Sequence, residues 1–157
     1  MTSSRRSWWV SPWLSIRAQL ALGAIFVAAA IPKILDPPSF AHMIYNYRLL
    51  PGPAINAVAL VLPWAELLAG LALVVGFAKR PAAAFCGGLL FVFLAALSIN
   101  LARGNPVNCG CFDVTARDKP RAELLSEMRW TIARDIGILF LVAQVLAATR
   151  PERNRLH

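Results

Sequence analysis

Residues 54–78 read AINAVALVLPWAELLAGLALVVGFA, and this stretch decides the fold class. Its only charged residue is Glu66, and its apolar side chains do not alternate with polar ones as they would in a half-buried strand. About 20 such residues, coiled as an α-helix, cross the roughly 30 Å hydrocarbon layer of a bilayer. The stretch therefore predicts a transmembrane helix with one acidic group near its middle.

Three further apolar segments are long enough to cross a bilayer once their flanking residues are counted. They run from Ala18 to Pro32, from Ala82 to Ile99 and from Thr131 to Thr149. Pro32 and Pro63 are expected to kink or end the helices that contain them. The predicted fold is an all-α, integral membrane four-helix bundle. It should fill residues 18–149, between a basic and aromatic N-terminal segment, 1–17, and a basic C-terminal tail, 150–157.

The connections between the spans carry turn-forming residues. Asp36-Pro37-Pro38 and Leu50-Pro51-Gly52-Pro53 enclose a short amphipathic stretch, residues 40–49, which we expect to lie along the membrane interface. The loop before the last span begins Arg103-Gly104-Asn105-Pro106, a sequence typical of a turn. These two connections have the most specific sequence outside the spans, and they hold most of the candidate functional residues there.

The composition indicates a lipid bilayer as the surroundings of the chain. Hydrophobic residues make up 58% of it and charged residues 15%, which is too apolar for a surface exposed to water. The formal net charge of +8 lies in short clusters between apolar runs, and no groove-reading motif accompanies it. The sequence therefore argues against a nucleic-acid partner.

Lysine and arginine residues near the span ends predict the orientation, because short cytoplasmic loops carry an excess of them. Basic clusters precede the first span, fill the turn at Lys79-Arg80 and follow the fourth span. Four spans put these clusters on one side, so we expect both termini in the cytoplasm and residues 33–53 and 100–130 outside. The bias is incomplete, because the second outside loop also holds basic residues, namely Arg103, Arg117, Lys119, Arg121 and Arg129.

The N-terminus has an alternative interpretation as a cleaved export signal. Arg5-Arg6 precede the first apolar run, and Ala28-Ala29-Ala30 could serve as a cleavage site. However, Trp8, Trp9 and Trp13 suit an interfacial aromatic belt, and cleavage would leave an odd number of spans. We therefore expect the first span to be retained.

The pair Cys109 and Cys111, separated by Gly110, is the most distinctive chemical feature. Two residues of extended chain reach at most about 7 Å, and glycine eases a tight bend, so an intramolecular disulfide is possible. Strained, exposed disulfides are the more easily reduced ones, and the space outside the cytoplasm is where disulfides persist. The pair favours reversible redox exchange. Arg103 could favour a thiolate at either sulfur, whereas Asp113 would oppose it, and both could also be solvated loop charges.

Two other interpretations of the cysteine pair stay open. It could be a static staple, although so small a ring would restrict the unfolded chain little. Two soft thiolates could also hold Cu(I), mercury or half of a zinc site, although neither His42 nor His157 lies near them in sequence. The third cysteine, Cys86, lies toward the opposite end of the third span and is expected to be a small buried apolar residue.

Glu66 is a functional candidate because an ionisable group in the middle of a span is costly. It should face the interior of the bundle, with Lys33, Arg134 and Asn100 as candidate partners. The alternative is a structural ion pair that sets the register of the helices. Arg134 and Asp135 could likewise form a local pair at the membrane interface.

The sequence resembles the MauE family of membrane proteins, which neighbours the broader DoxX-like four-helix group. The resembling features cover about two thirds of the chain, and Cys-Gly-Cys-Phe after an Arg-Gly turn is the most specific of them. They are Lys33, Asp36-Pro37, Phe40, Tyr47-Arg48-Leu49-Leu50-Pro51, Pro63-Trp64-Ala65-Glu66-Leu67-Leu68-Ala69-Gly70, Asn100-Leu101-Ala102-Arg103-Gly104, Cys109-Gly110-Cys111-Phe112 and Arg134-Asp135.

The resemblance implies a multi-pass protein of the bacterial plasma (inner) membrane that is associated with methylamine utilisation. The family is linked to maturation of the disulfide-rich small subunit of methylamine dehydrogenase, beside thioredoxin-fold proteins outside the cytoplasm. This sequence departs from the expected pattern at Asp113, where a glycine would be usual. Aspartate tolerates the left-handed conformation better than most residues, so the turn can survive.

The expected function is therefore thiol–disulfide exchange at Cys109 and Cys111 with a thioredoxin-fold partner or a disulfide-rich client. With one cysteine pair, the sequence does not encode a two-pair relay across the membrane. A quinone could serve as terminal acceptor, as in vitamin K epoxide reductase-like bundles, although no residue identifies a site for it. The alternatives are a non-enzymatic maturation scaffold with a structural disulfide, and heavy-metal binding or transport by the same thiols.

Overall fold

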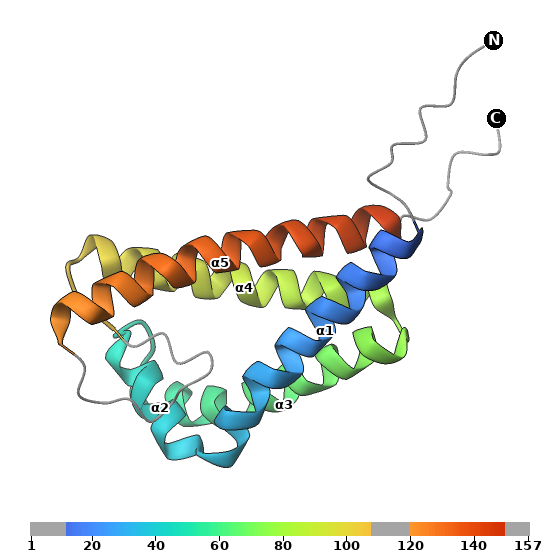
Figure 1. Ribbon diagram of the computed structural model, residues 1–157. Coiled ribbons are helices and arrows are strands. Elements are labelled where there is room, and N and C mark those ends of the chain that lie inside the picture. Colours follow the sequence, from blue (N-terminus) through green and yellow to red (C-terminus); the bar gives the residue numbers. More distant parts are fainter. Residues whose placement is uncertain (1–11, 108–119, 150–157) are drawn as a thin grey trace, which may run out of the picture.

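The computed structural model describes residues 12–107 and 120–149, and within these ranges the chain forms five α-helices and no strand (Figure 1). The helices are α1 Pro12–Leu35, α2 Pro37–Asn46, α3 Gly52–Val75, α4 Lys79–Ala102 and α5 Arg121–Ala148. All but α2 are long and apolar enough to cross a membrane. The predicted all-α fold with four membrane spans is confirmed.

The helices extend beyond the predicted spans. α1 continues through Pro32 to Leu35, so this proline does not end the helix, and Pro63 likewise lies inside α3. α5 begins at Arg121, well before the predicted start at Thr131. Hydropathy detects only the part of a helix that crosses hydrocarbon, whereas backbone hydrogen bonding can continue a helix into the polar layer.

The amphipathic connection between the first two spans forms α2. Asp36 caps this helix by accepting a hydrogen bond from the backbone N–H of Ser39 at 3.1 Å. Pro37 and Pro38 occupy its first turn, where a backbone donor is not needed. Phe40 and Met43 then pack against α3. The helix α2 therefore buries its apolar face against the bundle.

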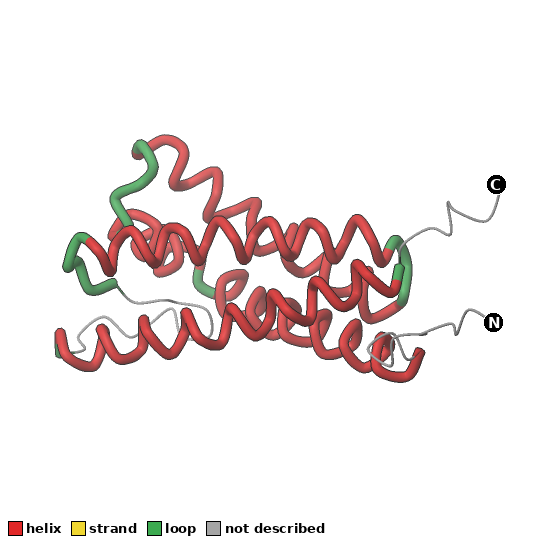
Figure 2. The backbone as a smooth tube through the Cα atoms, turned by 90° about the horizontal axis from the view of Figure 1, so that it is seen from above, coloured by secondary structure: helices red, strands yellow, loops and turns green. Residues whose placement is uncertain are grey.

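The four long helices run up and down, with α1 packed on α3 and α4 packed on α5 (Figure 1). The start of α1, the end of α5 and the α3–α4 turn lie at one end of the bundle, which we call the turn end. α2 and the loop that follows α4 lie at the other, the α2 end. In Figure 2 the described loops lie at the turn end and in the part of the bundle toward the α2 end, and the long helices run between them.

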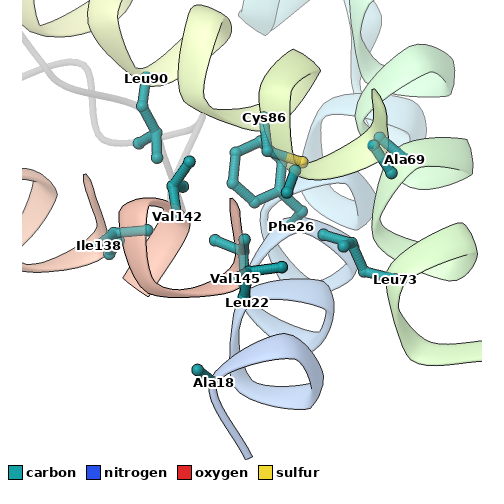
Figure 3. Packing of buried hydrophobic residues seen from close by; sticks show 12 residues of the cluster. Ala18, Leu22, Phe26, Ala69, Leu73, Cys86, Leu90, Ile138, Val142 and Val145 are labelled. Carbon is teal, nitrogen blue, oxygen red and sulfur yellow. The ribbon is translucent and has the colours of Figure 1, made fainter. Parts of the chain in front are cut away.

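The main core lies toward the turn end and takes residues from all four long helices (Figure 3). Leu22, Leu73 and Cys86 are fully buried there, and Val145 is 1% exposed. Cys86 thus packs as a small apolar residue, as expected from its place in a span. The one polar side chain of the first predicted span, Gln19, donates a hydrogen bond to the backbone oxygen of Leu73 and so joins α1 to α3.

Gly23 and Gly70 bring α1 and α3 into backbone contact. A Cβ atom added to Gly23 would lie 2.8 Å from the Gly70 oxygen, and one added to Gly70 would lie 2.9 Å from the Gly23 oxygen. Membrane helices pack closely where small residues meet, because apolar burial alone does not distinguish a helix neighbour from lipid. The two glycines therefore fix the crossing that places the polar side chains farther along both helices.

Candidate functional site

A cavity of about 440 Å³ lies between the helices, toward the α2 end of the bundle. All five helices contribute to its walls, which are almost entirely apolar. Four charged residues interrupt this lining: Lys33 from α1, Glu66 from α3, and Arg134 and Asp135 from α5. A largely apolar pocket with a few convergent polar groups is the default candidate for a ligand site.

Lys33 and Glu66 form a bidentate ion pair across the cavity wall. The lysine Nζ lies 2.9 Å from Oε1 and 2.7 Å from Oε2 of the glutamate, and the two residues are 7% and 8% exposed. The ammonium group also lies 5.2 Å from the ring centroid of Phe40, within cation–π range. Of the three candidate partners of Glu66, Lys33 is thus the one that binds it, and the carboxylate does face the interior.

Arg134 and Asp135 form the second ion pair of the cavity. The arginine Nε and Nη2 lie 3.1 and 3.0 Å from Oδ1 of Asp135. The aspartate is 1% exposed, and its other oxygen, Oδ2, accepts no hydrogen bond from any residue that the structure describes. The predicted local pair of Arg134 and Asp135 is therefore present, and its carboxyl group is buried in the protein. The sequence could have identified Asp135 as a site residue, because it is an acidic residue within a predicted span, as Glu66 is.

Asn100 does not contact Glu66, because it lies in the last turn of α4, at the level of the end of α2. Its Nδ2 donates to the backbone oxygens of Tyr47 at 3.2 Å and Ala96 at 3.0 Å, and its Oδ1 accepts from Nδ2 of Asn105 at 3.1 Å. Asn100 is 1% exposed. Asn100 therefore connects the end of α2 and the loop after α4 to α4 itself. It takes part in neither ion pair.

The remaining sequence-predicted site residues lie at or beyond the edge of the described chain. Arg103 follows the last residue of α4 and is exposed, away from the cavity lining. Cys109 and Cys111 fall in residues 108–119, outside the described residues. Arg5, Arg6 and the basic residues of the C-terminal tail also lie outside them. The structure therefore brings together Lys33, Glu66 and Arg134 around one cavity, adds Asp135 to them, and leaves Asn100 and Arg103 outside it.

The described residues that flank the cysteine segment are held together. Val107 is 3% exposed and packs in a cluster with Tyr47, Leu97 and Met128. On the far side of the segment, Arg121 Nη2 donates to the backbone oxygen of Gly104 at 2.9 Å. The chain therefore leaves and re-enters the described structure at the α2 end, next to the wall that Tyr47 contributes to the cavity.

A four-span bundle with two ion pairs in the wall of an otherwise apolar internal cavity defines a multi-pass membrane protein with charged residues in its interior. The chain belongs to the MauE family, because the family described as methylamine utilisation protein MauE matches residues 11–148. No solved structure matches the chain at a significant level.

Curated relatives agree with this assignment. The methylamine utilization protein MauE of Paracoccus denitrificans is 40% identical over 143 residues, which cover 90% of this chain and 73% of the relative. MauE of Methylophilus methylotrophus is 36% identical over 101 residues, covering 64% of this chain and 53% of the relative. MauE of Paracoccus versutus is 34% identical over 131 residues, covering 83% and 66%. The aligned region thus spans between about half and three quarters of these relatives.

Proposed function

We propose that this chain is a membrane component of methylamine utilisation that carries out thiol–disulfide exchange outside the cytoplasm, using Cys109 and Cys111. Membership of the MauE family supports the pathway, because the relatives are named methylamine utilization proteins. The Cys-Gly-Cys sequence supports the chemistry, since two thiols so close together can form and break a disulfide within one short loop.

The observation that carries the proposal is the anchoring of the cysteine segment at both of its flanks. Val107 is buried against Tyr47, the backbone N–H of Asn105 donates to the Asn100 oxygen at 3.0 Å, and Arg121 binds Gly104. A segment whose two flanks are fixed to one end of a bundle is suited to meet a partner protein outside the membrane. Both flanks lie at the end opposite the turn that carries the basic pair Lys79-Arg80.

The exchange follows ordinary thiol–disulfide chemistry. A thiolate of a thioredoxin-fold partner attacks one sulfur of the Cys109–Cys111 disulfide, which forms a mixed disulfide and releases the other cysteine as a thiolate. The second thiolate of the partner then attacks the mixed disulfide. The partner leaves as a disulfide, and the loop keeps two thiols that take up the two protons lost by the partner. In the reverse direction the second loop cysteine resolves the mixed disulfide.

In this proposal the supporting residues hold the helices in place and do not react themselves. The Lys33–Glu66 pair joins α1 to α3, and Asn100 joins α2 and the following loop to α4, so together they hold the α2 end that carries the cysteine segment. Arg134 holds Asp135 within α5, the helix that follows the segment. Arg103, on the loop side of α4, is proposed to favour the thiolate form of a nearby cysteine.

Thiol trapping tests the proposal directly. Cys109→Ser and Cys111→Ser are each purified in lipid nanodiscs and mixed with a thioredoxin-fold protein whose resolving cysteine is replaced by serine and whose remaining cysteine carries a thionitrobenzoate disulfide. The loop thiolate attacks that disulfide and releases thionitrobenzoate. At least one single variant should form a mixed disulfide, detected by non-reducing gels and mass spectrometry, and the double variant should form none. Cys86→Ser is the matched control, because that thiol is fully buried and its loss should leave trapping unchanged.

Two other outcomes would decide for the alternatives. A disulfide that no partner reduces, together with unfolding of the double variant, would identify a structural staple. Thiols that stay reduced at every accessible potential, with stoichiometric bound copper or mercury, would identify a metal-binding protein. In either case the exchange proposal is wrong, and the family assignment is unaffected.

A further inference from the structure

We infer that the cavity binds a neutral, lipid-soluble ring compound that bears a hydroxyl group, of the hydroquinone class. The inference rests on the described walls of the cavity and does not depend on the proposed chemistry of the cysteines. Four properties of those walls carry it: the position of the mouth, the balance of charge, one carboxyl oxygen to which no described residue donates, and the aromatic lining.

Exposed residues in the cavity lining place its mouth beside a membrane span. Val92 lines the cavity and is 66% exposed, although it lies near the middle of α4. Leu49 and Leu50, which precede α3, also line the cavity and are 40% and 42% exposed. The middle of a spanning helix lies in the hydrocarbon layer, so a ligand reaches this mouth from the bilayer. The occupant is therefore lipid-soluble.

The charges around the cavity balance without a ligand. Lys33 is paired with Glu66 and Arg134 with Asp135, so the four charged residues of the lining sum to zero. A charged ligand would add an uncompensated charge to a site of low dielectric constant, where such a charge is costly. This excludes the phosphate head group of an anionic lipid as the preferred occupant and favours a neutral molecule.

Asp135 supplies the polar contact that selects a hydroxyl group. The Asp135 side chain is 2% exposed, and the residue lines the cavity. Arg134 binds Oδ1, whereas Oδ2 accepts no hydrogen bond from the described residues. A buried acceptor gains most from a ligand that brings a donor. A hydroquinone carries an O–H donor, whereas the corresponding quinone carries only carbonyl acceptors.

The aromatic lining favours a flat ring over an acyl chain. Phe26, Phe40, Tyr47 and Phe93 all border the cavity, and the Tyr47 and Phe93 rings lie 6.1 Å apart at 49°. Aromatic side chains pack against other rings in offset or tilted arrangements. The volume of about 440 Å³ lies within the range of pockets that hold small organic ligands.

Equilibrium binding in nanodiscs of zwitterionic lipid tests the inference. A decyl-substituted benzohydroquinone and the matched benzoquinone are titrated anaerobically, and partition into protein-free nanodiscs is subtracted. The hydroquinone should bind at least about tenfold more tightly than the quinone, because a hydrogen bond to a charged group distinguishes the two forms. Cys109→Ser/Cys111→Ser should bind the hydroquinone as the wild type does, which separates this inference from the proposed function.

Two substitutions examine the site itself. Asp135→Asn should reverse the preference toward the quinone, because Arg134 holds the amide oxygen on its own side and leaves Nδ2 to donate into the cavity. Ala96→Phe fills the cavity from the α4 wall and should abolish binding of both forms. Ala95→Phe is the matched control: this neighbour is exposed and absent from the lining, so the variant should bind normally.

Three results would overturn the inference. Equal or tighter binding of the quinone by the wild type would remove the role of Asp135 as acceptor. Binding that survives Ala96→Phe would place the ligand outside the cavity. Displacement of the hydroquinone by phosphatidic acid, with no such effect of phosphatidylcholine, would identify an anionic lipid as the occupant.

Discussion

Lys33 and Glu66 join α1 to α3 through two hydrogen bonds of 2.9 and 2.7 Å, inside a part of the bundle where both side chains are about nine-tenths buried. Lys33 lies in the last turn of α1, where a cation also faces the negative end of the helix dipole. Glu66 lies near the middle of α3. Each charge is tolerated at this depth because the other neutralises it.

We predict that Lys33→Met destabilises the protein by about 3–5 kcal/mol, because it leaves Glu66 buried without its partner. The double variant Lys33→Met/Glu66→Leu should recover most of this loss, since neither charge then remains. Unfolding in mixed micelles, followed by circular dichroism, measures both values. If the double variant is as unstable as the single one, the cost arises from lost packing and the charge argument is wrong.

The close approach of Gly23 and Gly70 predicts a steric effect of a single methyl group. Gly70→Ala would place a Cβ atom 2.9 Å from the backbone oxygen of Gly23, so the helices must separate. We expect a loss of about 1–3 kcal/mol in the free energy of unfolding. Gly88→Ala is the matched control, because no heavy atom lies within 4 Å of the added Cβ and alanine favours a helix. A loss of the same size in both variants would contradict the predicted contact.

Replacement of Asn100 should loosen the α2 end locally. Asn100→Leu removes the donor to the Tyr47 oxygen and the acceptor for the Asn105 amide, at a cost of about 1–3 kcal/mol. Hydrogen exchange should become faster at residues 46–50 and 104–107 and stay unchanged at the turn end.

Ser98→Ala serves as the control for that experiment, since Ser98 lies on the exposed side of the same helix. Exchange that rises equally along the whole chain in Asn100→Leu would mean that Asn100 supports global stability instead of the local connection. Unchanged exchange would mean that the three hydrogen bonds of its side chain contribute nothing to this end.

The orientation predicted from the basic clusters can be tested with two exposed aromatic positions. Tyr45, near the end of α2, is 62% exposed, and Phe77, in the α3–α4 turn, is 75% exposed. In a background without cysteines, an impermeant thiol reagent applied to intact cells should label Tyr45→Cys. Phe77→Cys should react only after lysis. The opposite pattern would place both termini outside the cytoplasm and would also move the cysteine segment to the reducing side.

Much of the fold was predictable from residues 54–78 and the three similar runs. Hydrocarbon offers no hydrogen bonds to a backbone, so apolar segments of this length must satisfy their own N–H and C=O groups as helices. The same reasoning required an internal partner for Glu66. These conclusions depend only on composition and length, which the sequence determines by itself.

The partner of Glu66, the place of Asp135 and the cavity were decided by the tertiary structure. In a membrane span the lipid-facing and protein-facing sides are both apolar, so the pattern of side chains does not reveal which faces meet. Contact between Gly23 and Gly70 sets how α1 crosses α3, and that crossing brings Lys33 to Glu66 in place of Arg134 or Asn100. The pairing therefore depends on backbone contact between residues far apart in the chain, which no local feature of the sequence specifies.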